Sequence, residues 1–158
     1  MRENTHDEIL DHLFLGSAAA LREKKQFSMI VNCTKEIRFP KYCTNCVRMS
    51  VNDDPGNSSL LLKAINDSRI VEQMHLSISK KEDVLVHCFA GIQRSCTIVA
   101  CYLIKYHDMN PLEAIKYIQT KRPIAFMDHV NFLSTIESFY EVNLTSKEQE
   151  KVVDAFQL

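Results

Sequence analysis

The chain of 158 residues lacks any long apolar run. A helix that crosses a membrane needs roughly 20 consecutive, mostly apolar residues, and no segment approaches that length. Residues 1–7 also lack the apolar stretch of a secretory signal peptide. We therefore expect no membrane span and a cytoplasmic or nuclear location.

The chain also has little excess of charge of either sign. Its formal net charge is −1, although 25% of its residues are charged. This balance gives no reason to expect nucleic acid or an anionic membrane as an obligatory partner. No internal repeat, low-complexity tract or linker divides the sequence, so its length predicts a single domain over residues 1–158.

Six cysteines are present, but without a secretory signal we expect reduced thiols. Cys33, Cys96 and Cys101 lie in apolar sequence and are typical of small buried side chains. Cys43 and Cys46 form one Cys-x-x-Cys pair, but no second cysteine or histidine pair at suitable spacing completes four zinc ligands. The sequence therefore predicts neither a metal nor another cofactor.

Apolar, β-branched runs alternate with helical patterns along the chain. The runs predict a pair of strands within 8–15 and further strands at 27–33, 46–51 and 84–86. Helices are predicted at 17–22, 58–79, 96–107, 111–121 and 128–141, and a last short one from Thr145. Strands separated by helices predict an α/β fold, with a central, mostly parallel sheet of about five strands flanked by helices on both faces.

Residues 87–95, with the sequence His-Cys-Phe-Ala-Gly-Ile-Gln-Arg-Ser, follow a predicted strand and precede an apolar helix. Cys88 and Arg94 are separated by five residues, so both can belong to one tight loop. Such a loop holds a thiolate at its base and wraps backbone N–H groups and a guanidinium around a tetrahedral oxyanion. The helix N-terminus adds unpaired N–H donors and partial positive charge. This context predicts a nucleophilic site that holds a tetrahedral oxyanion.

The chemistry of such a site explains why these residue types occur in the loop. A free thiol, with a pKa of about 8.5, is mostly protonated at neutral pH, and Arg94, Ser95 and the helix N-terminus would each stabilise a Cys88 thiolate. Arg94 can hold two phosphate oxygens at once and stay charged. Gly91 permits a conformation or a close approach that a side chain would obstruct. His87 lies on an alternating strand, so its ring should point away from the thiol and orient the loop.

Thiolate attack on phosphorus expels an alkoxide or phenolate, so a general acid should protonate the leaving oxygen. Asp53 and Asp54 lie on the loop at 52–57, which carries several turn residues. Either carboxyl group is a candidate from its position. The alternative is that both only solvate the turn, or that Asp54 caps it.

Taken together, these residues resemble the Cys-x5-Arg protein phosphatases and, within them, the dual-specificity family, over roughly residues 8–141. The resemblance implies the cysteine-phosphatase fold, with Cys88 as nucleophile and Ser95 assisting departure of the thiolate. It favours Asp53 over Asp54 as general acid, because the family's acid follows a strand ending similar to residues 50–53. The implied phosphate-binding loop comprises Phe89, Ala90, Gly91, Ile92, Gln93 and Arg94.

The sequence departs from the family pattern at two points. Family members often have serine where Gln93 stands, and often Pro-Asn where Met127 and Asp128 stand. The family's asparagine helps to brace the catalytic loop, so we expect Asp128 to support the loop differently or to add negative charge.

Residues 142–158 lie outside the resemblance and are predicted to form a C-terminal helical extension. Their apolar side chains could mediate a homodimer, but we expect them to dock on the body of the domain. These side chains are Val152, Val153, Phe156 and Leu158.

The resemblance implies hydrolysis of phosphotyrosine, phosphoserine and phosphothreonine in proteins through a cysteinyl-phosphate intermediate. The chain has no room for the insertions that deepen the pocket of tyrosine-only phosphatases. Phosphoinositide phosphatases and RNA 5′-phosphatases share the chemistry, but their polyanionic substrates favour basic residues or histidine within the loop, and positions 89–93 have none. A pseudophosphatase that only binds phosphoproteins is the other alternative.

Overall fold

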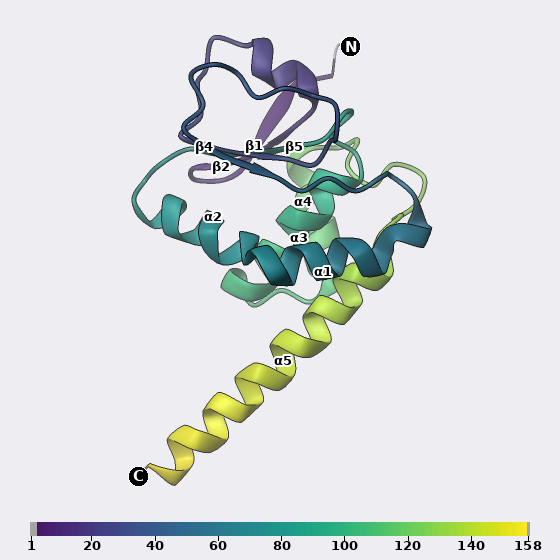
Figure 1. Ribbon diagram of the computed structural model, residues 1–158. Helices are drawn as coiled ribbons and strands as arrows, with labels where there is room; N and C mark the ends of the chain where they lie inside the picture. Colours follow the sequence, from purple (N-terminus) through teal and green to yellow (C-terminus); the bar gives the residue numbers. More distant parts are fainter. Residues whose placement is uncertain (1–2, 158) are drawn as a thin grey trace.

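The computed structural model describes residues 3–157, which fold around one five-stranded sheet (Figure 1). The strands are β1 (His6–Leu10), β2 (Leu13–Gly16), β3 (Met29–Asn32), β4 (Asn45–Arg48) and β5 (Val84–His87). Their order in the sheet is β1-β2-β5-β3-β4. Only the edge strand β1 runs antiparallel to its neighbour, and the other pairs are parallel. The expected mostly parallel sheet of five strands is confirmed.

Five α-helices cover one face of this sheet (Figure 1). They are α1 (Ser58–Ser68), α2 (Ile70–Ser79), α3 (Arg94–His107), α4 (Pro111–Lys121) and α5 (Leu133–Phe156). The other face carries the short 3-10 helix η1 (Ala18–Arg22) and loops, which enclose a smaller apolar cluster. A second 3-10 turn, η2 (Pro55–Asn57), precedes α1. None of the described helices is long and apolar enough to cross a bilayer.

The central strand β5 shows why the sheet is buried on both faces. All of its side chains are buried, because β2 and β3 flank it and both faces are covered. Val84 and Val86 pack into the main core with the helices, whereas Leu85 joins the smaller cluster with Phe27 on the opposite face. This alternation places Cys88 directly beyond the carboxyl end of a rigid strand.

The helix expected over 58–79 is instead two helices, α1 and α2. Arg69 separates them in the left-handed conformation, with φ of 54°. The Ser68 hydroxyl accepts a hydrogen bond from the Ile70 N–H, and such local bonds compete with the regular helical ladder. Leu61 and Ile65 of α1 and Val71 and Met74 of α2 are buried, whereas Leu62 and Ile78 are only partly buried.

The C-terminal helix also differs from the expectation. The helix predicted from residue 128 begins at Leu133, and it continues without a break to Phe156. Thr145 and Ser146, predicted to open a separate helix, donate their hydroxyls to carbonyls four residues earlier in α5. Their polar groups are therefore satisfied inside a continuous helix.

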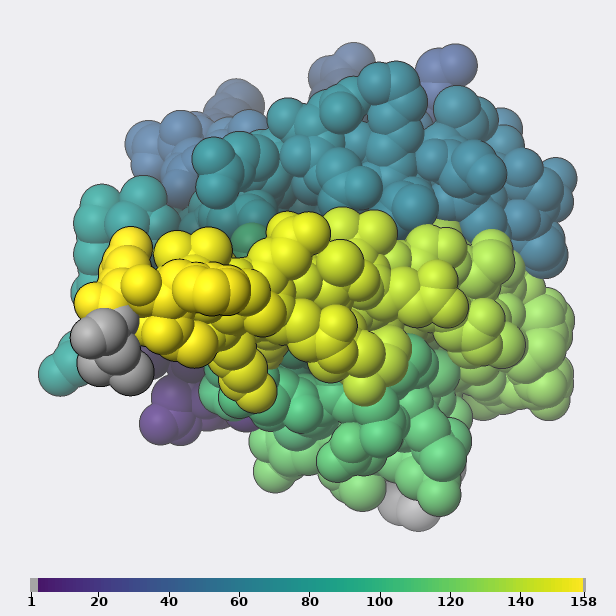
Figure 2. All heavy atoms as spheres, turned by 90° about the horizontal axis from the view of Figure 1, so that it is seen from below, coloured from purple at the N-terminus to yellow at the C-terminus, as the bar shows by residue number. Residues whose placement is uncertain are grey.

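The far end of α5 projects from the body instead of docking on it (Figure 1). Seen from below, the projecting helix overlies the middle of the domain, with α1 and α2 to one side of it and α3 and α4 to the other (Figure 2). Val152, Val153 and Phe156 are 54%, 53% and 86% exposed. The expected docking is thus wrong for these three residues, and Leu158 lies outside the described residues.

The cysteines correct one further expectation. Cys43 and Cys46 form a disulfide, so the prediction of six reduced thiols is wrong for this pair. Their Cα atoms are 6.1 Å apart, within the range that a disulfide can bridge. The remaining cysteines are free and buried, namely Cys33, Cys88, Cys96 and Cys101.

Candidate active site

The loop between β5 and α3 surrounds the sulfur of Cys88 with hydrogen-bond donors. Cys88 is 3% exposed. The Gly91 N–H donates to its Sγ over 3.2 Å, and the Ser95 Oγ lies 3.1 Å from the same atom. The N–H group and the hydroxyl are both placed where they can donate a hydrogen bond to this sulfur. The structure therefore brings together three of the residues that the sequence singled out.

Gly91 is required by both its conformation and its surroundings. Its φ is +69°, a region that residues with side chains rarely adopt. A Cβ at this position would lie 2.6 Å from the Gly16 carbonyl group and 2.7 Å from a guanidinium nitrogen of Arg122. No side chain can be accommodated here without moving the backbone of β2.

Arg94 is the first residue of α3, and its guanidinium spans the loops that follow β3 and β4. One terminal nitrogen, Nη1, donates to the carbonyls of Cys33 and Val51, at 3.3 and 3.1 Å. The Nε atom is buried and has no partner among the described residues. An unpaired buried donor costs about 1–3 kcal/mol, and an oxyanion in the loop would supply the missing acceptor.

The first turn of α3 is left open to a ligand. Gln93 precedes this helix, but its side chain makes no capping bond to the helix N-terminus. Its Nε2 instead donates to the His129 carbonyl over 2.6 Å, and its Oε1 accepts from the Asn131 N–H over 3.0 Å. The helix N-terminus therefore keeps free N–H donors and partial positive charge beside Cys88.

The two candidate acids have different surroundings. Asp54 caps η2, where its Oδ1 accepts the Gly56 N–H over 2.9 Å. Asp53 is exposed and takes no part in this cap, and its Oδ1 accepts from the Asn131 side-chain amide over 2.8 Å. The Arg94 contact to Val51, two residues before Asp53, ties the acidic loop to the catalytic loop.

His87 contacts the backbone and not the thiol, and its role in orienting the loop stays a prediction. Its side chain is fully buried, and Nδ1 lies 3.2 Å from the Cys88 carbonyl oxygen. Burial lowers the pKa of the imidazole, which favours the neutral ring. A neutral ring suits a position inside the sheet, where an unpaired positive charge would be costly.

Asp128 does not brace the loop. Its side chain is exposed and makes no hydrogen bond with any residue in the range 3–157. The expectation that the Asp128 side chain supports the loop is therefore wrong, whereas the alternative, that it adds negative charge near the loop, stays a prediction. Gln93 makes the connection to residues 129–131, and the Phe126 N–H donates to the Ile92 carbonyl over 2.8 Å.

Arg122 is a supporting residue that the sequence did not reveal. It is 1% exposed, and its Nε and Nη2 donate to the carbonyls of Gly91 and Ala90 at 2.9 and 3.2 Å. Its Nη1 bonds the Asn4 carbonyl and forms an ion pair of 2.8 Å with Asp7. The loop is thus held from behind by a buried guanidinium. No local pattern marks a residue 31 positions away from the glycine that it supports.

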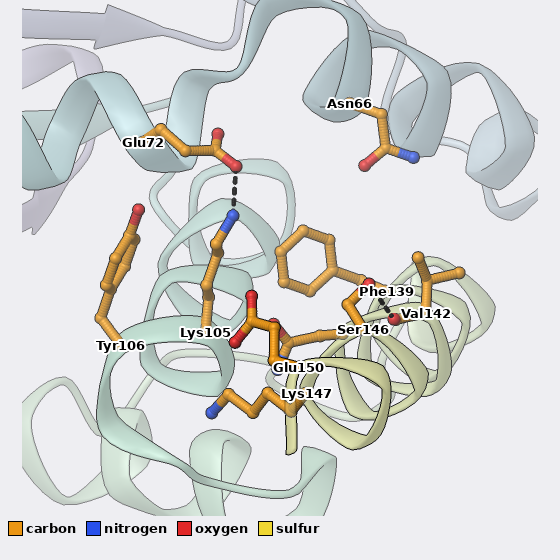
Figure 3. A pocket seen from close by; sticks show the side chains of 10 residues that line it. Asn66, Glu72, Lys105, Tyr106, Phe139, Val142, Ser146, Lys147 and Glu150 are labelled. Atoms are coloured by element: carbon orange, nitrogen blue, oxygen red, sulfur yellow. Dashed lines mark hydrogen bonds and ion pairs between the residues drawn. The ribbon is translucent and has the colours of Figure 1, made fainter. Parts of the chain in front are cut away.

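A hollow of the surface lies elsewhere, between α2, α3 and α5 (Figure 3). Glu72 and Lys105 form an ion pair on its wall, and Phe139 forms part of its lining. No residue of the catalytic loop lines it. Across residues 3–157, no three His, Cys, Asp or Glu side chains come together as a group that could hold a metal ion.

A cysteine after a buried strand, enclosed by N–H groups and by an arginine that opens the next helix, is the arrangement of the Cys-x5-Arg phosphatases. A sequence model described as "Dual specificity phosphatase, catalytic domain" matches residues 13–142. The chain therefore belongs to the dual specificity phosphatase family, and the expected family and enzyme class are confirmed.

Two curated relatives illustrate the extent of the similarity. Mouse dual specificity protein phosphatase 14 is 30% identical over 155 residues, covering 92% of this chain and 74% of the relative. Tyrosine-protein phosphatase yvh1 of Schizosaccharomyces pombe is 43% identical over 67 residues, covering 42% of this chain. That match spans only 20% of the length of yvh1.

The fold is shared with solved structures of the same kind. The crystal structure of human DUSP28 superposes with a TM-score of 0.79 at 22% sequence identity. The match covers 89% of this chain and 96% of the other. At this identity the likeness concerns the fold.

Proposed function

We propose that this chain hydrolyses phosphotyrosine, phosphoserine and phosphothreonine in proteins through a phosphorylated Cys88. One observation carries the proposal: the Cys88 sulfur lies among the Gly91 N–H, the Ser95 hydroxyl and the first turn of α3. These groups stabilise a thiolate and can also hold a phosphoryl group. The Nε of Arg94, which has no partner within residues 3–157, adds a charged donor for the same oxygens.

In the first step, the Cys88 thiolate attacks phosphorus, and an S–P bond forms as the P–O bond to the leaving group breaks. Asp53 donates its proton to the leaving oxygen, so that a neutral alcohol or phenol departs. Arg94 and the loop N–H groups hold the remaining phosphoryl oxygens while negative charge builds on them. Asp54 has no part in this step, because its carboxylate caps η2.

In the second step, water attacks the phosphorus of the cysteinyl-phosphate. Asp53, now ionised, accepts a proton from the water, and the S–P bond breaks to release inorganic phosphate. The sulfur leaves as a thiolate, and the Ser95 hydroxyl, 3.1 Å away, donates a hydrogen bond to it. Asp53 is then protonated again and Cys88 is again a thiolate, so the enzyme is ready for another cycle.

Protein substrates are favoured by the uncharged loop. Phe89 is 64% exposed and Ala90 is also exposed, so an apolar surface lies where a polyanion-directed enzyme would place cations. We would compare phosphopeptides with phosphoinositide vesicles and 5′-triphosphorylated RNA. A clear preference for the lipid or the RNA would overturn the protein assignment. A cytoplasmic or nuclear location stays a prediction.

The mechanism itself is tested with a small aryl phosphate. Wild-type protein should turn it over, vanadate should inhibit and EDTA should not, because the proposed chemistry uses no metal. Cys88→Ser should abolish turnover while keeping the fold and the binding of phosphate. Wild-type protein that binds phosphopeptides without any turnover would instead indicate a pseudophosphatase. Loss of activity in EDTA would contradict the cysteine mechanism.

The exposed end of α5 supports a second, separate proposal: self-association through residues 142–157. Val153 and Phe156 leave apolar surface in water that a second copy of the chain would bury. Analytical ultracentrifugation should show a dimer that Phe156→Asp dissociates. A monomer for both proteins at high concentration would contradict this proposal and leave the phosphatase assignment unaffected.

A further inference from the structure

A chain of hydrogen bonds connects the catalytic loop to the proposed general acid. Gln93 holds the segment 129–131 by two bonds, to the His129 carbonyl and from the Asn131 N–H, at 2.6 and 3.0 Å. Asn131 then donates its side-chain amide to the Oδ1 of Asp53 over 2.8 Å. Three loops that are distant in sequence therefore meet at one asparagine.

The bond to Asp53 distinguishes its two carboxyl oxygens. Asp53 lies on an exposed loop, and a carboxyl group without a fixed partner there can rotate freely. An amide N–H occupies Oδ1, which must therefore act as an acceptor. The proton is left to Oδ2, which has no hydrogen-bond partner within residues 3–157. Asn131 thus selects the oxygen that can give a proton away.

The orientation of the Asn131 amide leaves one of its own polar atoms unpaired, and this unfavourable arrangement indicates a function. Its own carbonyl oxygen, Oδ1, is buried without a partner among the described residues. Leaving such an acceptor unpaired is unfavourable. A flipped amide would place this oxygen against a carboxyl oxygen of Asp53 and lose the donor. The amide therefore serves Asp53 at the expense of its own carbonyl, a pattern found at functional sites.

We propose that Asn131 is a positioning residue, which fixes the carboxyl group of Asp53 so that Oδ2 transfers the proton to the leaving oxygen. The inference rests on the proposed role of Asp53 as general acid and deepens it. Within residues 3–157, Asn131 makes no hydrogen bond to Cys88 or Arg94, so we infer that it acts only through Asp53.

Gln93 explains how the asparagine is placed. Its amide both donates to His129 and accepts from Asn131, so it ties this segment to the catalytic loop at two points. A serine at this position has a shorter side chain with a single oxygen and could not span both groups. Gln93 and Asn131 therefore work as a pair, and the acid is held in register with the loop that holds phosphate.

The test is the dependence of the rate on the leaving group. General acid catalysis matters most for poor leaving groups and least for phenolates that depart unaided. Asn131→Ala should lower kcat/KM by about tenfold for phenyl phosphate, a part of the 10²–10⁴ that general acids contribute. For 2,4-dinitrophenyl phosphate the loss should be less than about twofold. Asn131→Asp also removes the amide donor and should show the same selectivity.

Three controls separate a positioning role from an effect of added charge or of a damaged phosphate loop. Asn143→Asp adds the same charge on α5, where no residue of the catalytic loop lies, and should leave both rates unchanged. Vanadate affinity should not change in Asn131→Ala if the phosphate loop is intact. In an Asp53→Asn background, Asn131→Ala should have no further effect, because the two residues act as one unit.

The outcomes are distinct. Equal losses for both substrates, or no loss, in a folded Asn131→Ala protein would overturn the positioning role. If Asp53→Asn itself shows no selective loss for phenyl phosphate, the proposed general acid is wrong, and the role of Asn131 falls with it. A selective loss in both single variants, without further loss in the double variant, supports the inference.

Discussion

Arg122 offers the sharpest test of how the catalytic loop is held. Arg122→Met keeps much of the buried hydrocarbon volume but removes every donor of the guanidinium. The carbonyls of Gly91 and Ala90 lose their partners, and the Asp7 carboxylate loses its counter-ion. Both side chains of the ion pair are largely buried, at 2% and 13% exposure. Solvent therefore cannot replace what is lost.

The expected cost follows from these contacts. Removing one partner of a buried ion pair costs about 3–5 kcal/mol, so we expect the free energy of unfolding to fall by about 4 kcal/mol. Unfolding entropy near 2.1 cal/mol/K per residue gives about 0.3 kcal/mol/K for this chain, and Tm should fall by about 12 °C. A typical domain has about 5–15 kcal/mol of stability, so the variant should still fold when cool.

Urea titrations and melting curves would measure the change, and kcat/KM would report on the loop. Asp7→Asn is the matched control, because it removes the carboxylate charge while Arg122 keeps its bonds to Gly91 and Ala90. It should retain more activity than Arg122→Met, because the hydrogen bonds to the loop carbonyls remain. An Arg122→Met protein within about 1 kcal/mol of wild type, with unchanged kcat/KM, would refute the argument that Arg122 supports the loop.

Three further predictions concern the stability of the domain. Burial holds the pKa of His87 below its ordinary value near 6.5, so the unfolded chain gains a proton first as pH falls. The free energy of unfolding should therefore decline below about pH 6.5, and less steeply in His87→Asn. Urea titrations that give wild type and His87→Asn the same pH dependence would contradict this. Asn110→Ala removes the cap that Asn110 and Glu113 form at the start of α4 and should cost about 1 kcal/mol, while an unchanged urea midpoint would show the cap to be dispensable. Deleting residues 148–158 should alter the free energy of unfolding by less than about 1 kcal/mol, because the described part of this segment is exposed, and a larger loss would mean that it packs on the domain.

What the sequence could predict depends on how far apart the interacting residues are. Cys88, Gly91, Arg94 and Ser95 lie within eight consecutive positions of one strand–loop–helix unit, so their spacing alone predicts their meeting. The start of α4 can also be predicted from neighbouring residues, because Asn110 and the proline after it are a strong signal for a helix N-terminus. The break between α1 and α2 was missed, because Arg69 in a left-handed conformation is no typical helix terminator.

The contacts that support the catalytic loop could not be predicted from the sequence, because the residues that make them are far apart along the chain. Gly91 accepts from Arg122 over 31 positions, and Asp53 accepts from Asn131 over 78, so tertiary packing alone brings these pairs together. The resemblance predicts that Asp128 either supports the loop differently or adds negative charge, and the exposed Asp128 side chain makes no hydrogen bond within residues 3–157. Gln93, the other departure from the family pattern, is long enough to reach residues 129–131 directly. Gln93 thus makes hydrogen bonds to this segment, whereas the Asp128 side chain makes none within residues 3–157.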